Sequence, residues 1–264
     1  MIFNAQVLQD RLSGKHIGSS VHFFDELEST NNTAFTLALN GAPEGSVVVA
    51  DHQTRGKGRL KRVWQSPPKC NLYTSIILRP DILPVFAPQI TLMSGVAVAE
   101  LLSEHYSMPA TLKWPNDVQI KGKKICGILT EMKVAGDHKV EFVIVGIGVN
   151  VNMRKEHFDE PFREESTSMK EEAGRDISLL DFTVQLYHHL EHWYNIWIER
   201  GFAPVRETWL QYSSMSGKRI RMVLHDHVQE GDMLGIDEYG SLLLRDETGV
   251  VKKMMAGDAS VLKE

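Results

Sequence analysis

The feature that most constrains this chain is a cationic, glycine-containing segment at residues 53–64. It reads Gln-Thr-Arg-Gly-Lys-Gly-Arg-Leu-Lys-Arg-Val-Trp, and residues 55–62 carry five Lys and Arg side chains with no carboxylate among them. Gly56 and Gly58 alternate with the cations, so neither helix nor strand is favoured. Glycine lets a backbone approach a ligand closely, while Lys and Arg donate charge-assisted hydrogen bonds to phosphate or carboxylate oxygens. We therefore predict a loop that binds an anion, with a solvated surface loop as the alternative.

Two predicted strands hold this loop at its ends. Residues 45–51 are rich in β-branched side chains and lead directly into the loop, and residues 72–79 leave it as a second apolar run. A helix is predicted at residues 89–106, where apolar side chains recur at helical spacing around the small pair Ser94-Gly95. The small pair suits a helix that packs closely on a sheet.

Charge and composition limit the class of protein. The chain has 264 residues, 42% of them apolar, and a formal net charge of -5. This negative balance opposes a nucleic-acid or membrane-surface binder, so the cationic loop is a local exception. The two cysteines, Cys70 and Cys126, cannot form a disulfide framework and fit a reducing compartment. We see no signal-like N-terminus and no apolar run near the roughly 18 residues that span a bilayer, and therefore expect a cytoplasmic protein.

Small polar residues begin one predicted helix, and glycines interrupt one predicted strand. The helix starts with Ser29, Thr30 and Asn31, which either cap it or offer its free N–H groups to a polar ligand. Residues 140–151 predict a buried strand in which Gly146 and Gly148 leave room for a ligand. The dinucleotide-binding pattern fails there, because Val151 stands where a third glycine would be.

A second polar turn follows at residues 111–118. Pro115 forces Trp114 into an extended conformation, so the neighbouring polar side chains can project from the end of a strand: Lys113, Asn116 and Asp117. A Lys and an Asp at such a place could serve magnesium, ATP or an acid–base step. Residues 121–131, which include Lys124 and Gly127, predict a hairpin turn followed by a strand.

The C-terminal half divides into a loop, helices and a small β domain. Residues 153–175 are charged and poor in large apolar side chains, so we predict a loop that orders over a ligand. Ser178 opens a capping box for a long helix that ends at Arg200. Within it, residues 188–192 match the H-x-x-E-H zinc spacing, which we reject because no third ligand is marked out. A polar break then separates a catalytic domain at 1–213 from a small β-barrel or sandwich at 214–264.

Five motifs, in this order and spacing, resemble those of the biotin protein ligases. They are Glu28-Ser29-Thr30-Asn31, residues 53–64, Lys113-Trp114-Pro115-Asn116-Asp117, Lys123-Lys124-Ile125-Cys126-Gly127 and Val145-Gly146-Ile147-Gly148-Val149-Asn150. The resemblance implies that biotin and ATP give biotinyl-5'-adenylate and pyrophosphate, and that a lysine of a biotin carboxyl carrier protein domain then attacks the adenylate. It also implies an α/β (α+β) fold with a central mixed sheet flanked by helices, related to class II tRNA synthetases, and a small SH3-like C-terminal β-barrel. Since we see no DNA-binding module before the core, we expect the monofunctional type, which does not bind nucleic acid.

The resemblance implies a role for each matched residue. Those matched to biotin contacts are Ser29, Thr30, Asn31, Gln53, Gly56, Lys57, Gly58, Arg59, Lys124, Gly127 and Gly146. Those matched to nucleotide contacts are Arg59, Arg62, Trp64, Asn116, Lys124 and Asn150. The catalytic positions are Lys124, Asp117 and Arg59. Two residues depart from the family loop, Lys57 in place of Arg and Lys61 in place of Gly, which predicts looser ligand retention because Lys lacks the planar fork of Arg.

The implied chemistry requires cations where two anions meet. A carboxylate that attacks a triphosphate needs positive charge to offset repulsion and to stabilise the pentavalent phosphorus. Lys124, Arg59, Arg62 and the magnesium that accompanies ATP can supply it, and no protein metal site is predicted. The alternatives are a lipoate or octanoate ligase of the same fold, and a non-catalytic protein that senses biotin or a nucleotide. Such a sheet is also compatible with a homodimer through an edge strand.

Overall fold

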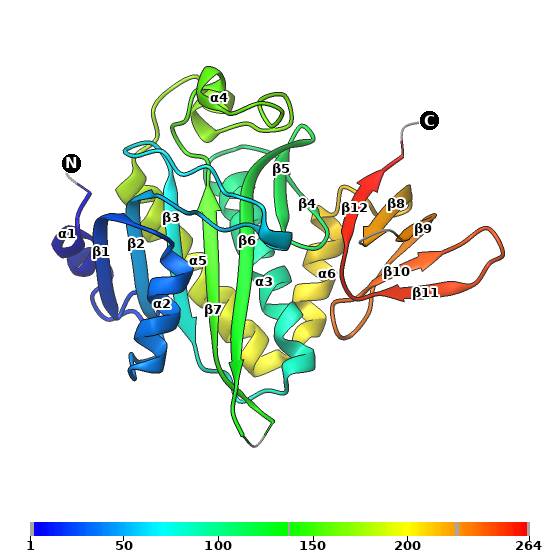
Figure 1. The fold of residues 1–264 in the computed structure, drawn as a ribbon, viewed down its shortest axis with the longest axis horizontal. Helices are drawn as coiled ribbons and strands as arrows, with labels where there is room; N and C mark the ends of the chain where they lie inside the picture. The colour runs from blue at the N-terminus through cyan, green and yellow to red at the C-terminus, as the bar shows by residue number, and fades with distance from the viewer. Residues whose placement is uncertain (1–2, 137, 225–226, 263–264) are drawn as a thin grey trace.

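The computed structural model describes residues 3–136, 138–224 and 227–262, and its core is a seven-stranded mixed sheet (Figure 1). Its strands are β1 (Ser20–Leu27), β2 (Ser46–Gln53), β3 (Leu72–Leu78), β4 (Ala110–Lys113), β5 (Asp117–Ile120), β6 (Lys123–Val134) and β7 (Val140–Val149). Their spatial order is β1-β2-β3-β7-β6-β5-β4. The β1–β2 pair is parallel and the other pairs are antiparallel. The prediction of a central mixed sheet is confirmed.

Helices cover both faces of this sheet. The α-helices in the described ranges are α1 (Ala5–Arg11), α2 (Thr30–Leu39), α3 (Ala87–Glu100), α4 (Met169–Ala173), α5 (Leu179–Arg200) and α6 (Phe202–Tyr212), of which α4 lies above the ends of the strands in Figure 1. Figure 1 shows α2 in front of the sheet and α3, α5 and α6 behind it. The prediction of a long helix capped by Ser178 is confirmed, because the Ser178 side chain accepts a hydrogen bond from the Asp181 N–H at 3.2 Å.

The helical segment Pro84–His105 corrects one expectation from the sequence. It is long and apolar enough to cross a membrane, although we expected no such run. In its most apolar window 72% is buried inside the protein, because α3 packs against the sheet and also against α5 and α6. Its apolar character is that of a core helix covered on more than one side.

Side-chain alternation along β7 assigns residues to the two sides of the sheet. Val143 and Val145 belong to the large hydrophobic cluster that includes α3 and α5, whereas Phe142 and Ile144 belong to a small cluster with α2. The next two positions with the Phe142 orientation are Gly146 and Gly148. The sheet is therefore hollowed on its α2 side, where these strand positions lack side chains.

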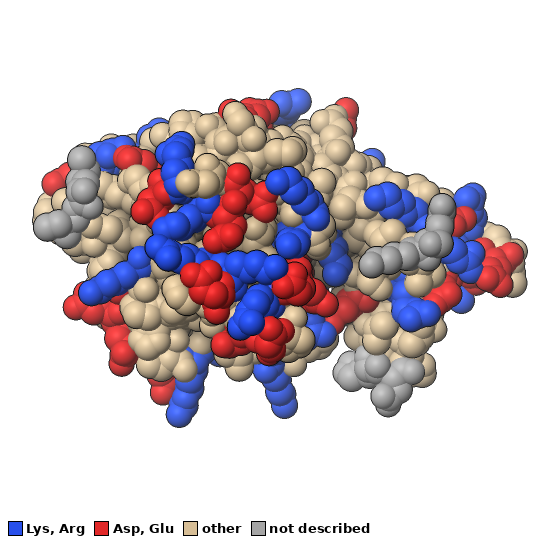
Figure 2. Space-filling view, turned by 90° about the horizontal axis from the view of Figure 1, so that it is seen from above, with Lys and Arg blue, Asp and Glu red and all other residues tan. Residues whose placement is uncertain are grey.

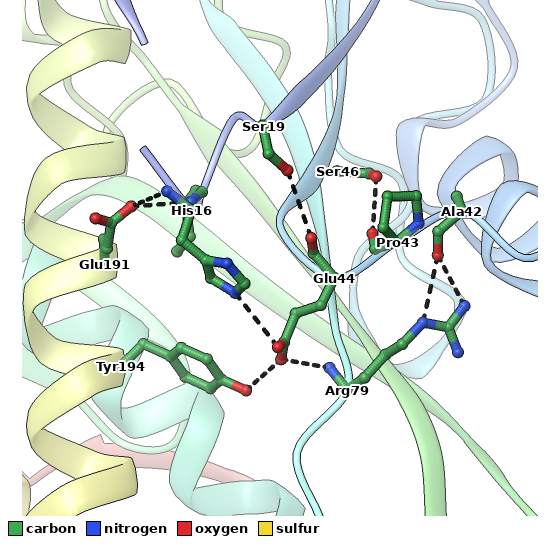
Figure 3. A network of polar contacts seen from close by, with 10 residues as sticks. His16, Ser19, Ala42, Pro43, Glu44, Ser46, Arg79, Glu191 and Tyr194 are labelled. Atoms are coloured by element: carbon green, nitrogen blue, oxygen red, sulfur yellow. Dashed lines mark hydrogen bonds and ion pairs between the residues drawn. The ribbon is translucent and has the colours of Figure 1, made fainter. Parts of the chain in front are cut away.

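Two partly exposed carboxylates, Glu191 and Glu44, link the segment after α1 to α5 (Figure 3). Glu191 accepts hydrogen bonds from the N–H groups of His16 and Ile17 at 2.8 and 2.9 Å. The Tyr194 hydroxyl donates to Glu44 at 2.6 Å, and the His16 ring nitrogen lies 3.3 Å from the same carboxylate. Glu191 thus has a structural task, although it stands within the H-x-x-E-H spacing.

The C-terminal region forms a separate antiparallel sheet. Its strands are β8 (Arg219–Leu224), β9 (His227–Ile236), β10 (Leu242–Arg245), β11 (Val251–Met254) and β12 (Asp258–Val261), in the order β11-β10-β9-β8-β12. The expected small β domain is present, but its last strand, β12, was not predicted. Closure into a barrel would require β11 and β12 to pair, and among the described residues they occupy opposite edges of an open sheet.

Candidate active site

A cavity of about 490 Å³ opens on the α2 side of the central sheet. It is lined by every residue that the sequence predicted to bind a ligand or to catalyse, from Ser29 at the start of α2 to Asn150 after β7. The structure therefore brings all five motifs together, while the role of each residue stays a prediction. The cationic segment at residues 53–64, called here the cationic loop, forms one wall between the ends of β2 and β3.

Three glycines on β6 and β7 give the cavity its depth. A Cβ atom added to Gly146 would lie 2.0 Å from the Oδ1 atom of Asn31. Cβ atoms added to Gly127 and Gly148 would lie 2.9 and 2.6 Å from the indole of Trp64, which packs over both. Any side chain at these positions would displace Asn31 or Trp64, so the glycines are required by close approach.

Uncharged polar groups line one end of the cavity. The Gln53 side-chain oxygen accepts hydrogen bonds from the Thr30 N–H and hydroxyl at 2.8 and 3.1 Å, and its amide donates to the Ser66 hydroxyl at 2.9 Å. The Ser75 Oγ lies 2.8 Å from Thr30 Oγ1 and 2.7 Å from Asn31 Oδ1. All these residues are buried. A connected buried network of this kind holds its donors and acceptors in fixed directions, which suits recognition of a neutral polar ring.

A chain of contacts links this network to the cationic loop. The Asn31 amide donates to the Leu129 carbonyl at 3.1 Å and to the Glu131 carboxylate at 2.8 Å. The other carboxylate oxygen of Glu131 lies 3.4 Å from the Lys57 ammonium. Lys57 is 39% exposed, so this ion pair adds little to stability, but it connects the loop to the wall of the cavity.

Cations and a carboxylate line the opposite end. The Lys124 ammonium lies 2.7 Å from Asp117 Oδ1 and 5.3 Å from the centre of the Trp64 ring. The Arg59 guanidinium donates to the Asn116 side-chain oxygen at 2.9 Å. Burial lowers the pKa of Arg59 from its ordinary value, while the Asp258 and Asp117 carboxylates oppose this change. Arg59 remains a cation at neutral pH, because its ordinary pKa is far above that range.

The indole N–H of Trp64 is a buried donor that has no hydrogen-bond partner within the described ranges. Such orphan donors are uncommon in folded proteins and call for an explanation. The Trp64 side chain lines the cavity, so an acceptor atom on a bound ligand would satisfy this group.

Residues 153–167, called here the cap, close the cavity above the cationic end. The Gln65 amide donates to the His157 carbonyl at 2.8 Å and accepts from the Asp159 N–H at 3.1 Å. The Lys124 backbone donates to Glu165 and accepts from Thr167, so the cap is held on two sides. The prediction of a loop at residues 153–175 is partly wrong, because this segment contains a 3-10 turn, Lys155–His157, and helix α4. Apolar side chains of the cap also line the cavity: Met153, Phe158 and Phe162.

Charges on the face seen from above are mixed. Figure 2 shows Lys and Arg side chains interspersed with Asp and Glu over this face. Ion pairs account for part of this pattern, among them Lys155 with Glu164 in the cap and Lys121 with Glu172 in α4. The positive charge of the cationic loop is therefore a feature of the cavity wall, not of a wide basic surface.

Several residues that line or support the cavity were not predicted. They are Ser66, Ser75, Glu131, Phe158, Phe162 and Asp258. Strand alternation could have indicated Ser75, because it lies on the same face of β3 as the cavity-lining Tyr73, two residues before it. No local signal pointed to Asp258, because it reaches the cavity from the C-terminal sheet.

Family models match both parts of the chain. Residues 23–150 match the Biotin/lipoate A/B protein ligase family, and residues 215–262 match the Biotin protein ligase C terminal domain.

Individual proteins match over most of the chain. A Bifunctional ligase/repressor BirA of Bacillus subtilis is 39% identical over 242 residues, which are 92% of this chain and 74% of that protein. A Biotin--[acetyl-CoA-carboxylase] ligase of Paracoccus denitrificans is 32% identical over 225 residues, 84% of this chain and 92% of that protein. A structure of the biotin protein ligase from Aquifex aeolicus in complex with biotin and ATP superposes with a TM-score of 0.79 at 29% identity. The superposition covers 93% of this chain and 99% of the Aquifex aeolicus chain.

Proposed function

This chain belongs to the biotin protein ligase family, and from that premise we propose a task for each end of the cavity. It is an ATP-dependent enzyme that joins biotin to a lysine of a biotin carboxyl carrier protein domain. The observation that carries the assignment is the division of one cavity into a neutral hydrogen-bonding end and a cationic end, where the Lys124 ammonium lies 5.3 Å from the centre of the Trp64 ring.

The neutral end binds the ring system of biotin in this proposal. Thr30, Asn31 and Gln53 present donors and acceptors that are held by Ser66 and Ser75. A ureido group has both N–H donors and a carbonyl acceptor, so it suits a wall with both kinds of partner. Ser29, Gly56, Gly58 and Gly127 complete this end.

The cationic end binds the triphosphate and activates it. In the first step a carboxylate oxygen of biotin bonds to the α-phosphorus, and the bond from that phosphorus to the pyrophosphate oxygen breaks. Lys124, Arg59 and Arg62 offset the negative charge that builds up there. The unpaired Trp64 N–H then has a carboxylate or phosphate oxygen to bind. Asn116 and Asn150 stand on the nucleotide side, and Phe158 and Phe162 offer apolar surface to a purine.

Asp117 acts in the second step. The carrier lysine amine attacks the acyl carbon of the adenylate, AMP leaves, and the amine loses a proton. Asp117 lines the cavity and is held by Lys124 at 2.7 Å, so its carboxylate is placed to accept that proton or to orient the amine.

Magnesium enters with ATP. Mg²⁺ prefers oxygen ligands and is commonly held by one or two carboxylates together with substrate phosphates. Asp117 is a cavity-lining carboxylate that could contribute, and no group of three or more His, Cys, Asp or Glu side chains forms a metal cage within the described ranges. When bound, the ion would neutralise phosphate charge beside the cations of the protein.

The division of the chain at residues 213 and 214 also belongs to this proposal, with the catalytic cavity in the first part and the small β domain in the second. Cytoplasmic location fits the carrier protein that the proposal names as partner. Two cysteines without a disulfide, Cys70 and Cys126, support a reducing compartment.

Pyrophosphate release with ATP and magnesium tests this function, with biotin, lipoate and octanoate compared as the acid. We expect release with biotin and background release with the other two. Release with lipoate or octanoate in place of biotin would move the assignment to another acid of the same reaction type. Absence of release with all three would favour a non-catalytic sensor of biotin or a nucleotide.

A further inference from the structure

One wall of the active cavity comes from the C-terminal sheet. Asp258, the first residue of β12, lines the cavity together with the cationic loop. Its carboxylate forms an ion pair with Arg62 and lies 3.6 Å from the Arg59 guanidinium. The Gly257 carbonyl accepts a second hydrogen bond from Arg59 at 2.9 Å. Both arginines that the proposed function places at the triphosphate therefore contact the start of β12.

The C-terminal sheet is anchored to the catalytic domain at another place, which leaves Asp258 free of that task. The turn between β9 and β10 accepts hydrogen bonds from the Trp114 indole through the Gly240 carbonyl at 3.0 Å and from the Gln89 amide through the Glu238 carbonyl at 2.6 Å. Tyr239 stacks on Phe86 with ring centres 5.7 Å apart. Trp114 is only 3% exposed. Loss of the Asp258 carboxylate should therefore leave the sheet docked.

We propose that Asp258 is a positioning residue for adenylation, which couples the C-terminal domain to the cationic loop. A guanidinium carries five N–H donors in a rigid plane, so partners on one edge fix the direction of the others. Asn116 and Gly257 accept hydrogen bonds from Arg59, whose guanidinium lies 3.6 Å from Asp258, and Asp258 accepts a hydrogen bond from Arg62. The remaining donors are directed at the phosphates of ATP and at the adenylate. This inference rests on the proposed function, since it assigns the arginines to the triphosphate.

Asp258 could instead compete with phosphate for the two arginines, and the direction of the change in ATP affinity on its removal distinguishes the two roles. A carboxylate that only competes with phosphate for the two arginines would weaken ATP binding, and its removal would tighten it. A carboxylate that orients the arginines strengthens ATP binding, and its removal weakens it. Asp258 is 32% exposed and Arg59 is 21% exposed, so the pair lies partly out of solvent, where orientation is better maintained.

The test is biotin-dependent ATP–pyrophosphate exchange by the full chain, with Asp258→Ala and Asp258→Asn compared to the unchanged protein. We expect Asp258→Ala to raise the KM for ATP by about tenfold and to release labelled adenylate about tenfold faster, as for loss of one charge-assisted contact. The Asn variant, which keeps one acceptor oxygen, should fall between. The KM for biotin and the thermal midpoint should stay near those of the unchanged protein. Asp232→Ala is the matched control, because it removes an ion pair with Arg245 within the same sheet.

A double-mutant cycle with Arg62→Ala makes the test specific. If Asp258 acts through Arg62 and Arg59, its removal in an Arg62→Ala background should cost less than its removal alone. Full additivity, a lower KM for ATP in Asp258→Ala, or a lower thermal midpoint with unchanged KM would each overturn the inference. No exchange by the unchanged protein would instead overturn the proposed function, and this inference with it.

Discussion

The substitution Gly146→Ala tests whether the close approach of Asn31 to β7 builds the biotin end of the cavity. The new methyl carbon would lie 2.0 Å from Asn31 Oδ1, whereas ordinary contacts begin at 3.4 Å, so the Asn31 side chain must move. It would then lose its contacts with Ser75, Leu129 and Glu131, which have lengths of 2.7, 3.1 and 2.8 Å. At about 1 kcal/mol for each such bond, the loss disfavours the original arrangement of Asn31 by about 3 kcal/mol. Because biotin binds that arrangement in this account, its apparent affinity falls by roughly 100-fold.

Isothermal titration with biotin measures this effect. We expect Gly146→Ala to weaken biotin binding by roughly 100-fold and the control Gly136→Ala, whose new methyl group would meet no atom within 4 Å, to leave it unchanged. Asn31→Ala removes the same hydrogen bonds and also the clash. The double variant should therefore bind biotin about as well as Asn31→Ala alone. Wild-type affinity in Gly146→Ala, or additive losses in the double variant, would refute the reasoning.

Three further substitutions or conditions test other parts of the account. Asp117→Asn should slow transfer from preformed adenylate to the carrier lysine by about 100-fold, as for loss of a general base, and unchanged transfer would exclude that role. Trp114→Phe should lower the free energy of unfolding by about 1–3 kcal/mol in urea titrations, because the buried Gly240 carbonyl loses its donor; an unchanged midpoint would contradict this. Burial raises the pKa of Cys70 to about 11, so iodoacetamide should label the native protein slowly at pH 8 and faster as the pH rises toward that value. The raised pKa stabilises the folded protein below the ordinary thiol pKa and this contribution is lost as the pH rises through about 11; rapid labelling at pH 8 would disprove the shift.

Local patterns in the sequence predicted the elements that position the site. Helical spacing at residues 89–106 predicted α3, a β-branched run predicted β2, and a second apolar run predicted β3 on the other side of the cationic loop. Gly146 and Gly148 were predicted to leave room for a ligand, and they lie in the wall of the cavity. These features were predictable because each depends on residues close together in the chain.

Contacts between distant segments could not be predicted in the same way. Glu131 meets Asn31 and Lys57 only because β6 passes α2 and the cationic loop in the folded sheet. Asp258 lies in a strand of four residues with little alternation, so neither the strand nor its contact with Arg62 had a local signal. The apolar run in Pro84–His105 was missed because small and polar residues, such as Ser94 and Gly95, divide its large apolar side chains.

Covalent transfer to a carrier domain tests the central claim most directly. The chain, biotin, ATP and magnesium would be incubated with a biotin carboxyl carrier protein domain, and the intact mass of that domain would be measured with and without ATP. The account predicts the addition of one biotinyl group to a single lysine, only when ATP is present, and none when that lysine is replaced by arginine. An unmodified carrier domain in the presence of all substrates, or labelling that persists without the lysine, would contradict it.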